Sequence, residues 1–138
     1  MNIAVNFWVV LGTAVVTMII GALWYSPKAF GNTWARLAGL DGAKMEEMKR
    51  GGMGKSYVTA FIGTLIISYV MAHFVALMGL VTFAEGAQLG FWVWLGFIVP
   101  SFLGSVLWEG RPWKLYAINV GHYLVAFALA GGLLATFG

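Results

Sequence analysis

The sequence predicts an all-α integral membrane protein, a bundle of four transmembrane helices with a short interfacial helix in its first cytoplasmic loop. The first reason is composition: of 138 residues, 61% are hydrophobic and 9% charged, against roughly 45–50% and about 25% in soluble domains. The second is that four long apolar runs fill most of the chain, and the third is that all eight basic residues lie between these runs on one side. The whole chain, 1–138, is expected to form a single transmembrane domain.

The apolar runs cover about residues 3–24, 57–83, 89–108 and 115–137. Each is long enough for an α-helix to cross about 30 Å of hydrocarbon, which takes roughly 20 residues. The runs do not alternate polar and apolar residues, as the strands of a membrane barrel would. In lipid every backbone N–H and C=O must find a partner inside the protein, so each run is expected to be a helix.

The distribution of charge predicts the orientation in the membrane. The loop at 25–56 holds Lys28, Arg36, Lys44, Lys49, Arg50 and Lys55, and the loop at 109–114 holds Arg111 and Lys114. The connection at 82–88 and both termini hold no basic residue. Basic loops stay in the cytoplasm, so both termini are expected to be extracytoplasmic. This topology explains the net charge of +3, and no nucleic-acid partner is expected.

The first loop is expected to contain a short helix on the membrane surface. Ser26 is a suitable N-cap, and Pro27 follows at the first helical position, where its missing N–H has no cost. Phe30, Trp34 and Leu37 then recur at helical spacing. Apolar side chains on one face of a basic helix are typical of helices that lie in the interface.

A second short helix is predicted after Gly39, which should end the first one. Asp41 is a suitable N-cap for it, Met45 and Met48 would share a face, and Gly51 should end it. The simplest interpretation of the whole loop is a solvated connector that fixes the topology. The alternative is a surface that binds lipid or a partner protein.

Small residues recur at spacings of four in each apolar run, which allows helix backbones to approach closely in lipid. The sets are Thr13/Thr17/Gly21, Thr64/Ser68/Ala72/Ala76, Gly96/Pro100/Gly104 and Ala128/Gly132/Thr136. One four-helix bundle does not need this many packing faces, so the pattern favours a homo-oligomer. Pro100 has no N–H to donate to the Gly96 carbonyl and predicts a kink in the third run.

The main candidate site is a polar cluster near the cytoplasmic side of the last run. Asn119, His122 and Tyr123 are spaced i, i+3 and i+4, so they share one helix face. Glu109 and Arg111 precede them in a tight turn and could join them in a pocket open to the cytoplasm. One interpretation is a proton relay or a ligand site, because histidine titrates near physiological pH. The other is a buried polar network that fixes helix packing.

His73 and Asn6 form a secondary candidate near the opposite side of the membrane. At about 1.5 Å per residue, His73 lies about 15 Å further from the cytoplasmic end of its helix than His122 does from its own. The two histidines are therefore too far apart to bind one metal ion or haem, and no metal or cofactor is expected. No HExxH, GxSxG or GxxxxGK[ST] motif occurs, so a non-enzymatic protein is expected.

Two motifs resemble those of a known family. Residues 21–31 (GALWYSPKAFG), followed by Trp34 and Leu37, resemble the opening motif of the bacterial membrane family called domain of unknown function 1761. Residues 109–123 (EGRPWKLYAINVGHY) are similar to that family's second motif. The resemblance implies a four-helix integral membrane protein and transfers no activity.

These observations together predict a small, non-enzymatic, homo-oligomeric protein of the bacterial cytoplasmic (inner) membrane. Its partners are expected to be membrane lipid and further copies of itself, and a small-molecule or ion ligand stays open. The alternative is a small channel or a proton-coupled transporter that uses His122, His73 or both.

Overall fold

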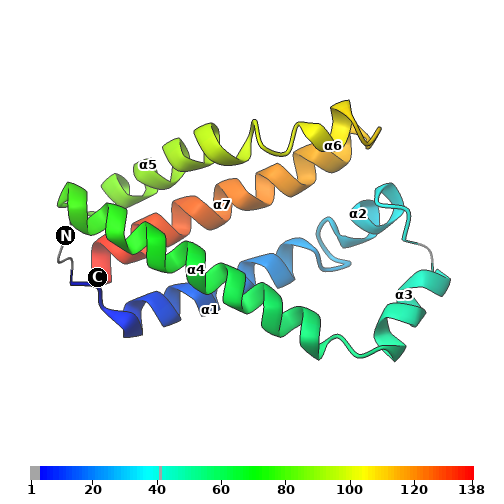
Figure 1. The fold of residues 1–138 in the computed structure, drawn as a ribbon, viewed down its shortest axis with the longest axis horizontal. Helices are drawn as coiled ribbons and strands as arrows, with labels where there is room; N and C mark the ends of the chain where they lie inside the picture. Colours follow the sequence, from blue (N-terminus) through cyan, green and yellow to red (C-terminus); the bar gives the residue numbers. More distant parts are fainter. Residues whose placement is uncertain (1–3, 41) are drawn as a thin grey trace.

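The computed structural model describes residues 4–40 and 42–138, which are helical with no β-strand in these two ranges. The helices are α1 (Phe7–Trp24), α2 (Gly31–Leu37), α3 (Gly42–Arg50), α4 (Gly54–Met78), α5 (Phe83–Val93), the π-helical turn η1 (Trp94–Ile98), α6 (Gly104–Leu107) and α7 (Trp113–Phe137). In Figure 1 the long helices run side by side. The end of α7 and the α4–α5 turn lie at one end, here called the terminal end, and α2 and α3 lie at the other, here called the basic end.

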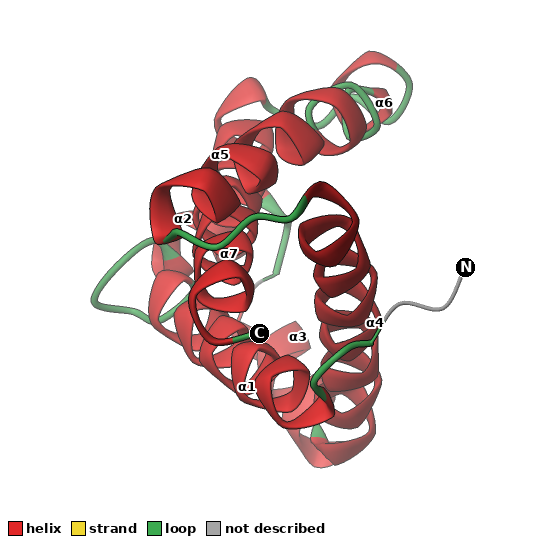
Figure 2. Cartoon of the chain, turned by 90° about the vertical axis from the view of Figure 1, so that its left-hand side faces the viewer, coloured by secondary structure: helices red, strands yellow, loops and turns green. Residues whose placement is uncertain are grey.

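Three helices, α1, α4 and α7, are long and apolar enough to cross a membrane. Helix α7 lies among α1, α4 and α5 (Figure 2) and contributes many of the buried side chains. Large apolar side chains point outward instead; Trp8, for example, is 81% exposed and Phe97 is 69% exposed. Such a surface is suited to lipid, because hydrocarbon covers apolar side chains without the cost that water imposes.

The third apolar run is not one continuous helix, which corrects the prediction of an unbroken helix over 89–108. Helix α5 passes into η1, and residues 99–103 form turns before α6. Pro100 causes the interruption, since it has no N–H to continue the ladder, and the Val99 amide donates to the Trp94 carbonyl five residues back. The Tyr116 hydroxyl donates to the carbonyl of Val99 at 2.6 Å. A side chain of α7 therefore satisfies a carbonyl at the break.

Capping residues set other boundaries that the apolar runs did not reveal. Asn6 is the N-cap of α1, and its side-chain oxygen accepts from the amides of Trp8 and Val9. Gly79, with φ of 66°, ends α4 in the left-handed conformation. Thr82 then caps α5. The helix of the second apolar run is shifted from the predicted bounds of about 57–83: α4 covers Gly54–Met78, and the third segment begins earlier than residue 89.

The predicted surface helix forms, but it begins later than expected and faces the bundle. Ser26 does not cap it, because its hydroxyl donates to the Leu23 carbonyl, and α2 starts at Gly31. Phe30 packs on Trp24, with ring centroids 4.7 Å apart. The helix ends before Gly39, which has φ of 77°, as predicted. Leu37 is half-buried in the last turn.

The second short helix is present as α3, and it is followed by Gly52 with φ of 80°. Asp41, its predicted cap, lies outside the described residues, as do the side chains of Met45 and Met48.

Glycines bring the backbones of α5 and α7 into direct contact. A Cβ on Gly90 would overlap the carbonyl of Phe127, and a Cβ on Gly86 would overlap that of Gly131. Gly86 and Gly90 form a GxxxG pair, the spacing that permits this approach. Of the predicted small-residue faces, those of α1 and α4 are used inside the chain, since Thr13, Ser68 and Ala72 are buried. On the third run, Gly96 and Pro100 are exposed.

Candidate functional site

His122 is the centre of the candidate site. Its ring lies on the face of α7 that meets α1, where a Cβ added to Gly21 would come within 3.2 Å of Nε2. Aromatic rings surround it: the centroid of Tyr25 is 5.3 Å away, that of Trp24 6.4 Å and that of Tyr123 5.0 Å. Both ring nitrogens are buried, and neither has a hydrogen-bond partner in the described part of the chain. At least one of them bears a proton, so a donor and an acceptor are unused here.

Two further polar side chains stand beside this ring. The Tyr25 hydroxyl donates to Oδ1 of Asn119 at 2.8 Å. Asn119 lies one helical turn before His122 on α7. Burial, assisted by the nearby Tyr123, raises the pKa of Tyr25 to about 12, so the phenol stays a neutral donor at physiological pH. The Asn119 amide nitrogen has no partner among the described residues and is not buried. Tyr25, Asn119 and His122 are called the polar trio below.

The indole of Trp24 fixes the end of α1 next to the trio. Its Nε1 donates to the carbonyl of Ile118 on α7 at 3.0 Å. A Cβ on Gly121 would lie 3.3 Å from the same ring, so a small residue at this position lets the indole lie against α7. The carbonyl belongs to the turn that carries Asn119, and the bond therefore holds Tyr25 and Asn119 in register.

A cavity of about 340 Å³, here called the His122 cavity, opens beside the ring among α1, α4 and α7. Its walls include Thr17, Met18, Gly63, Thr64, Ile67 and Phe127, in addition to Gly21, His122 and Tyr123. A larger groove of about 1000 Å³, here called the basic-end groove, lies between the basic ends of α1 and α4 and includes Tyr25 and Asn119. The two spaces share Met18, Gly21, Ala60 and Tyr123 on their walls. Volumes of this size match those of small-molecule sites.

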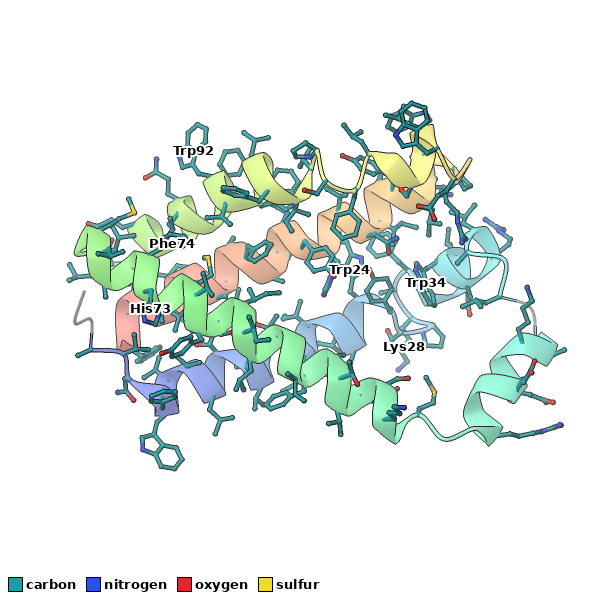
Figure 3. The ribbon with its side chains drawn as sticks, viewed as in Figure 1. Trp24, Lys28, Trp34, His73, Phe74 and Trp92 are labelled. Atoms are coloured by element: carbon teal, nitrogen blue, oxygen red, sulfur yellow. The ribbon has the colours of Figure 1, made fainter. Side chains whose placement is uncertain are left out.

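Helix α2 and the turn before it cover the basic end of the site. Trp34 packs edge-on against Tyr25 with a centroid distance of 5.3 Å, and Phe30 covers Trp24. Figure 3 places Trp24, Trp34 and Lys28 together at this end. The predicted interfacial side chains Phe30 and Trp34 therefore also close the bundle beneath the polar trio.

The structure brings together only part of the predicted cluster. Asn119, His122 and Tyr123 lie side by side on α7, and Tyr123 also stacks on Phe102. Arg111 instead donates from Nη1 to the Ala38 carbonyl at 3.2 Å, which ties the two basic loops together. Glu109 is exposed. Neither of these two charged residues lines the His122 cavity or the basic-end groove.

Sequence reasoning missed Tyr25, Trp24 and Gly21 as parts of the site. An aromatic pair at the end of a span is typical of a membrane-interface anchor, and the spacing of Gly21 placed it among several small packing residues. The sequence signal for these residues was that all three lie in the 21–31 motif. Two of them also form an aromatic pair at the end of the first apolar run. Nothing in the spacing indicated that Tyr25 meets Asn119, which is 94 residues away.

The secondary candidates have local roles. Nδ1 of His73 is 2.8 Å from the Tyr69 carbonyl of the preceding turn, and the two rings pack edge to face. Asn6 caps α1. Neither lines the His122 cavity. Within residues 4–40 and 42–138 no cluster of His, Asp or Glu could hold a metal ion.

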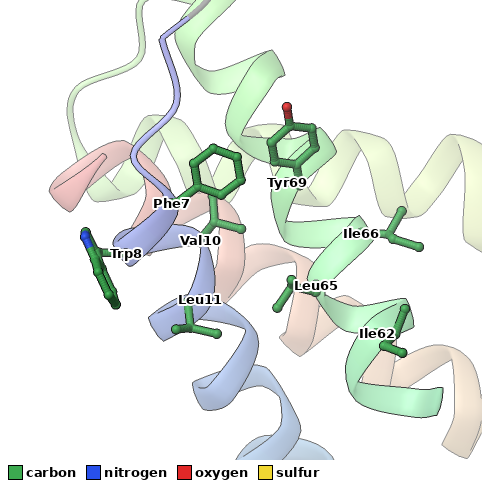
Figure 4. Close-up of a pocket in the computed structure, with 8 residues that line it drawn as sticks. All are labelled: Phe7, Trp8, Val10, Leu11, Ile62, Leu65, Ile66 and Tyr69. Atoms are coloured by element: carbon green, nitrogen blue, oxygen red, sulfur yellow. The ribbon is translucent and has the colours of Figure 1, made fainter. Parts of the chain in front are cut away.

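A separate pocket of about 470 Å³ lies between α1 and α4 toward the terminal end. Figure 4 shows its wall, in which Leu11, Ile62 and Ile66 are purely hydrocarbon. Phe7 stacks on Tyr69 at its rim, with a centroid distance of 5.6 Å. The pocket has no charged group and suits a lipid chain, so it offers no chemistry.

Comparison with known proteins places the chain in a family. Searches among curated proteins and among solved structures found no match. One family model, described as "Protein of unknown function (DUF1761)", matches residues 8–135. The match includes both motifs that form the site, 21–31 and 109–123. The chain therefore belongs to the DUF1761 family.

Proposed function

We propose that the protein is a non-enzymatic, membrane-embedded binding protein for a small amphiphilic molecule, which the polar trio holds by its polar end. The observation that carries the proposal is that both ring nitrogens of His122 lack a partner while the ring borders a cavity. In lipid an unpaired polar group costs several kcal/mol. A bound molecule that hydrogen-bonds to His122 would remove that cost.

The proposal includes a membrane topology. The chain crosses the bacterial cytoplasmic membrane four times, with the interrupted segment α5–η1–α6 as the third crossing, and both termini are extracytoplasmic. Support comes from the basic residues, which belong to the two loops of the basic end. Support also comes from the close contact of α5 with α7, which gives the interrupted segment a protein partner along its length. Polar backbone at membrane depth is tolerated where protein covers it.

Nitrogen NMR of the two histidines tests the binding proposal directly. The chain has only His73 and His122, so protein labelled with ¹⁵N-histidine in lipid nanodiscs gives few ring signals, and His122→Gln assigns them. We expect decanol or decanoic acid to shift the His122 ring signals in a saturable way. The His73 ring, with Nδ1 at the Tyr69 carbonyl, serves as the internal control and should not shift.

A substitution adds an energetic test. His122→Phe keeps an aromatic ring and removes both nitrogens, and we expect it to weaken binding of the same probes about fivefold, since a hydrogen bond contributes roughly 1 kcal/mol. Signals of His122 that stay fixed at saturating concentrations of both probes would refute the proposal. Equal affinity in the His122→Phe variant would show that the trio does not recognise the polar end.

A transporter is the second candidate, favoured by the interrupted third segment beside α7. Broken helices next to a central site occur in secondary transporters. In this alternative the bound molecule crosses the membrane, with His122 as the titrating group. Flux into proteoliposomes that is lost in His122→Phe would support it.

A homo-oligomer accompanies either role in our proposal, because Gly96 and Pro100 leave a small-residue face uncovered. Cross-linking in native membranes tests whether the chain forms this oligomer.

A further inference from the structure

We infer that the ligand of the polar trio is a single-chain amphiphile with an oxygen-acceptor head, of the fatty-acid class, and that it enters from the bilayer through the basic-end groove. This inference rests on the proposed function and adds the route and the chemical class. It depends on three features: where the groove opens, what stands at its basic end, and which hydrogen-bonding groups face the groove.

The groove opens toward lipid. Its rim includes Val15 and Ile19 of α1 and Tyr57 of α4, which are 43%, 53% and 60% exposed. These are apolar or aromatic side chains on the outer faces of two helices that are long and apolar enough to span a membrane. A molecule dissolved in the bilayer can therefore reach the groove without crossing water.

Aromatic side chains stand at the basic end of the groove, where Trp34 also lines it. Trp34 and Phe30 pack on Tyr25 and Trp24, and the bond from Arg111 to the Ala38 carbonyl holds the end of α2 to the other basic loop. The side chains beneath the trio are thus aromatic rings in contact with one another. A ligand that arrives from this side meets these rings next to Tyr25 and Asn119.

The free groups at the groove favour an acceptor head. Asn119 uses its oxygen to accept from Tyr25, which leaves its amide N–H groups for an incoming oxygen. The His122 ring stands one helical turn from Asn119, on the wall of the adjoining His122 cavity. Lys28, three residues after Tyr25, is an exposed cation at the same end. Among the described residues no acidic side chain lines the groove or the cavity, so a carboxylate head meets no like charge there.

The apolar walls of the two adjoining spaces favour a single hydrocarbon chain. The walls beyond the trio are apolar, with Met18, Ile67 and Phe127 along the His122 cavity. A single hydrocarbon chain can follow these walls while its head stays at Asn119 and His122.

Photo-crosslinking with a diazirine analogue of palmitic acid in liposomes tests this inference, with two glycine variants as a matched pair. Gly63→Leu projects a side chain into the cavity, because Gly63 lines it and a Cβ there meets nothing within 4 Å. Gly12→Leu is the control, since Gly12 also has nothing within 4 Å and lines neither space. We expect cross-links on α1, α4 and α7 around the trio, reduced about tenfold in Gly63→Leu and unchanged in Gly12→Leu.

Cysteine labelling separates the routes, because the chain has no native cysteine. In Ala60→Cys, whose position lines both spaces, we expect reaction with a lipid-soluble maleimide, slowed by palmitic acid, and little reaction with a charged thiosulfonate. Ser56→Cys, exposed at the basic end, is the reference for access from water.

The outcomes are distinct. Equal cross-linking of the two glycine variants means that the probe only surrounds the protein as bulk lipid does, and this overturns the inference. Ala60→Cys that reacts with the charged reagent as fast as Ser56→Cys also overturns it, because the site is then open to water. If the His122 signals still respond to the probes in either case, binding itself stands. If they do not respond, the proposed function fails first.

Discussion

The Gly90→Ala variant tests the contact between α5 and α7 most sharply. The added methyl group would overlap the carbonyl of Phe127 and lie 2.8 Å from the amide nitrogen of Ala128. These are backbone atoms, so no side-chain rotation can make room, and the helices must separate. Overpacking of this kind costs typically about 1–3 kcal/mol, and the gain in helix propensity from alanine returns about 1 kcal/mol. We expect a net loss of up to about 2 kcal/mol in the free energy of unfolding, and a loss of about 1–3 kcal/mol relative to a glycine-to-alanine change that meets no neighbour.

The Gly12→Ala variant is the control for this experiment. A Cβ at Gly12 meets nothing within 4 Å, so only the gain in propensity remains, about 1 kcal/mol. Unfolding by sodium dodecyl sulfate in mixed micelles, followed by tryptophan fluorescence, gives both free energies. If Gly90→Ala is as stable as Gly12→Ala, the two backbones do not touch, and α5 is not packed on α7 as described.

Three other predictions concern single polar groups. Tyr116→Phe leaves the Val99 carbonyl at the helix break without its partner and should lower the free energy of unfolding by about 1–3 kcal/mol, measured by the same titration. Trp94→Phe removes the indole bond to the Val120 carbonyl and should cost about 0.5–1.5 kcal/mol. The pKa of Tyr25 is raised to about 12 from 10.0, so its contribution to the folded state is complete below pH 10 and is lost as the pH rises toward 12; the pH dependence of unfolding in the wild type and in Tyr25→Phe measures this contribution.

Long apolar helices were predictable, because length and hydropathy decide them. The helices α1, α4 and α7 were all expected, within a few residues at each end. The ends themselves depend on caps such as Asn6, whose role as an N-cap competes with its interpretation as a site residue. The break at residues 99–103 was signalled by Pro100, but its extent was not. A proline removes one donor from the helix. Whether the helix then bends or stops depends on partners for the carbonyls at the break, such as Tyr116 for the Val99 carbonyl, and only the packing reveals these partners.

The candidate site was predictable as a helix face and not as a pocket. Spacing alone places Asn119 next to His122 on one helix. It cannot place Tyr25 there, since that contact depends on the crossing of α1 and α7. Glu109 and Arg111 were assigned to the cluster because they are close in sequence. The turn directs Arg111 to the other basic loop instead, where it meets Ala38.

Among the polar side chains of α7, His122 is the exception that points to an occupant. Tyr116 donates to Val99, Asn119 accepts from Tyr25, and Thr136 donates to the Gly132 carbonyl of its own helix. Packing therefore accounts for Tyr116 and Thr136, whereas Asn119 keeps its amide nitrogen free of partners in the described part of the chain. The Ser68 hydroxyl is also buried without a partner, but it lines neither the His122 cavity nor the basic-end groove, so no ligand could reach it from there. Among the described residues, only His122 combines buried ring nitrogens that lack a partner with an adjoining cavity, and a structural histidine would need neither.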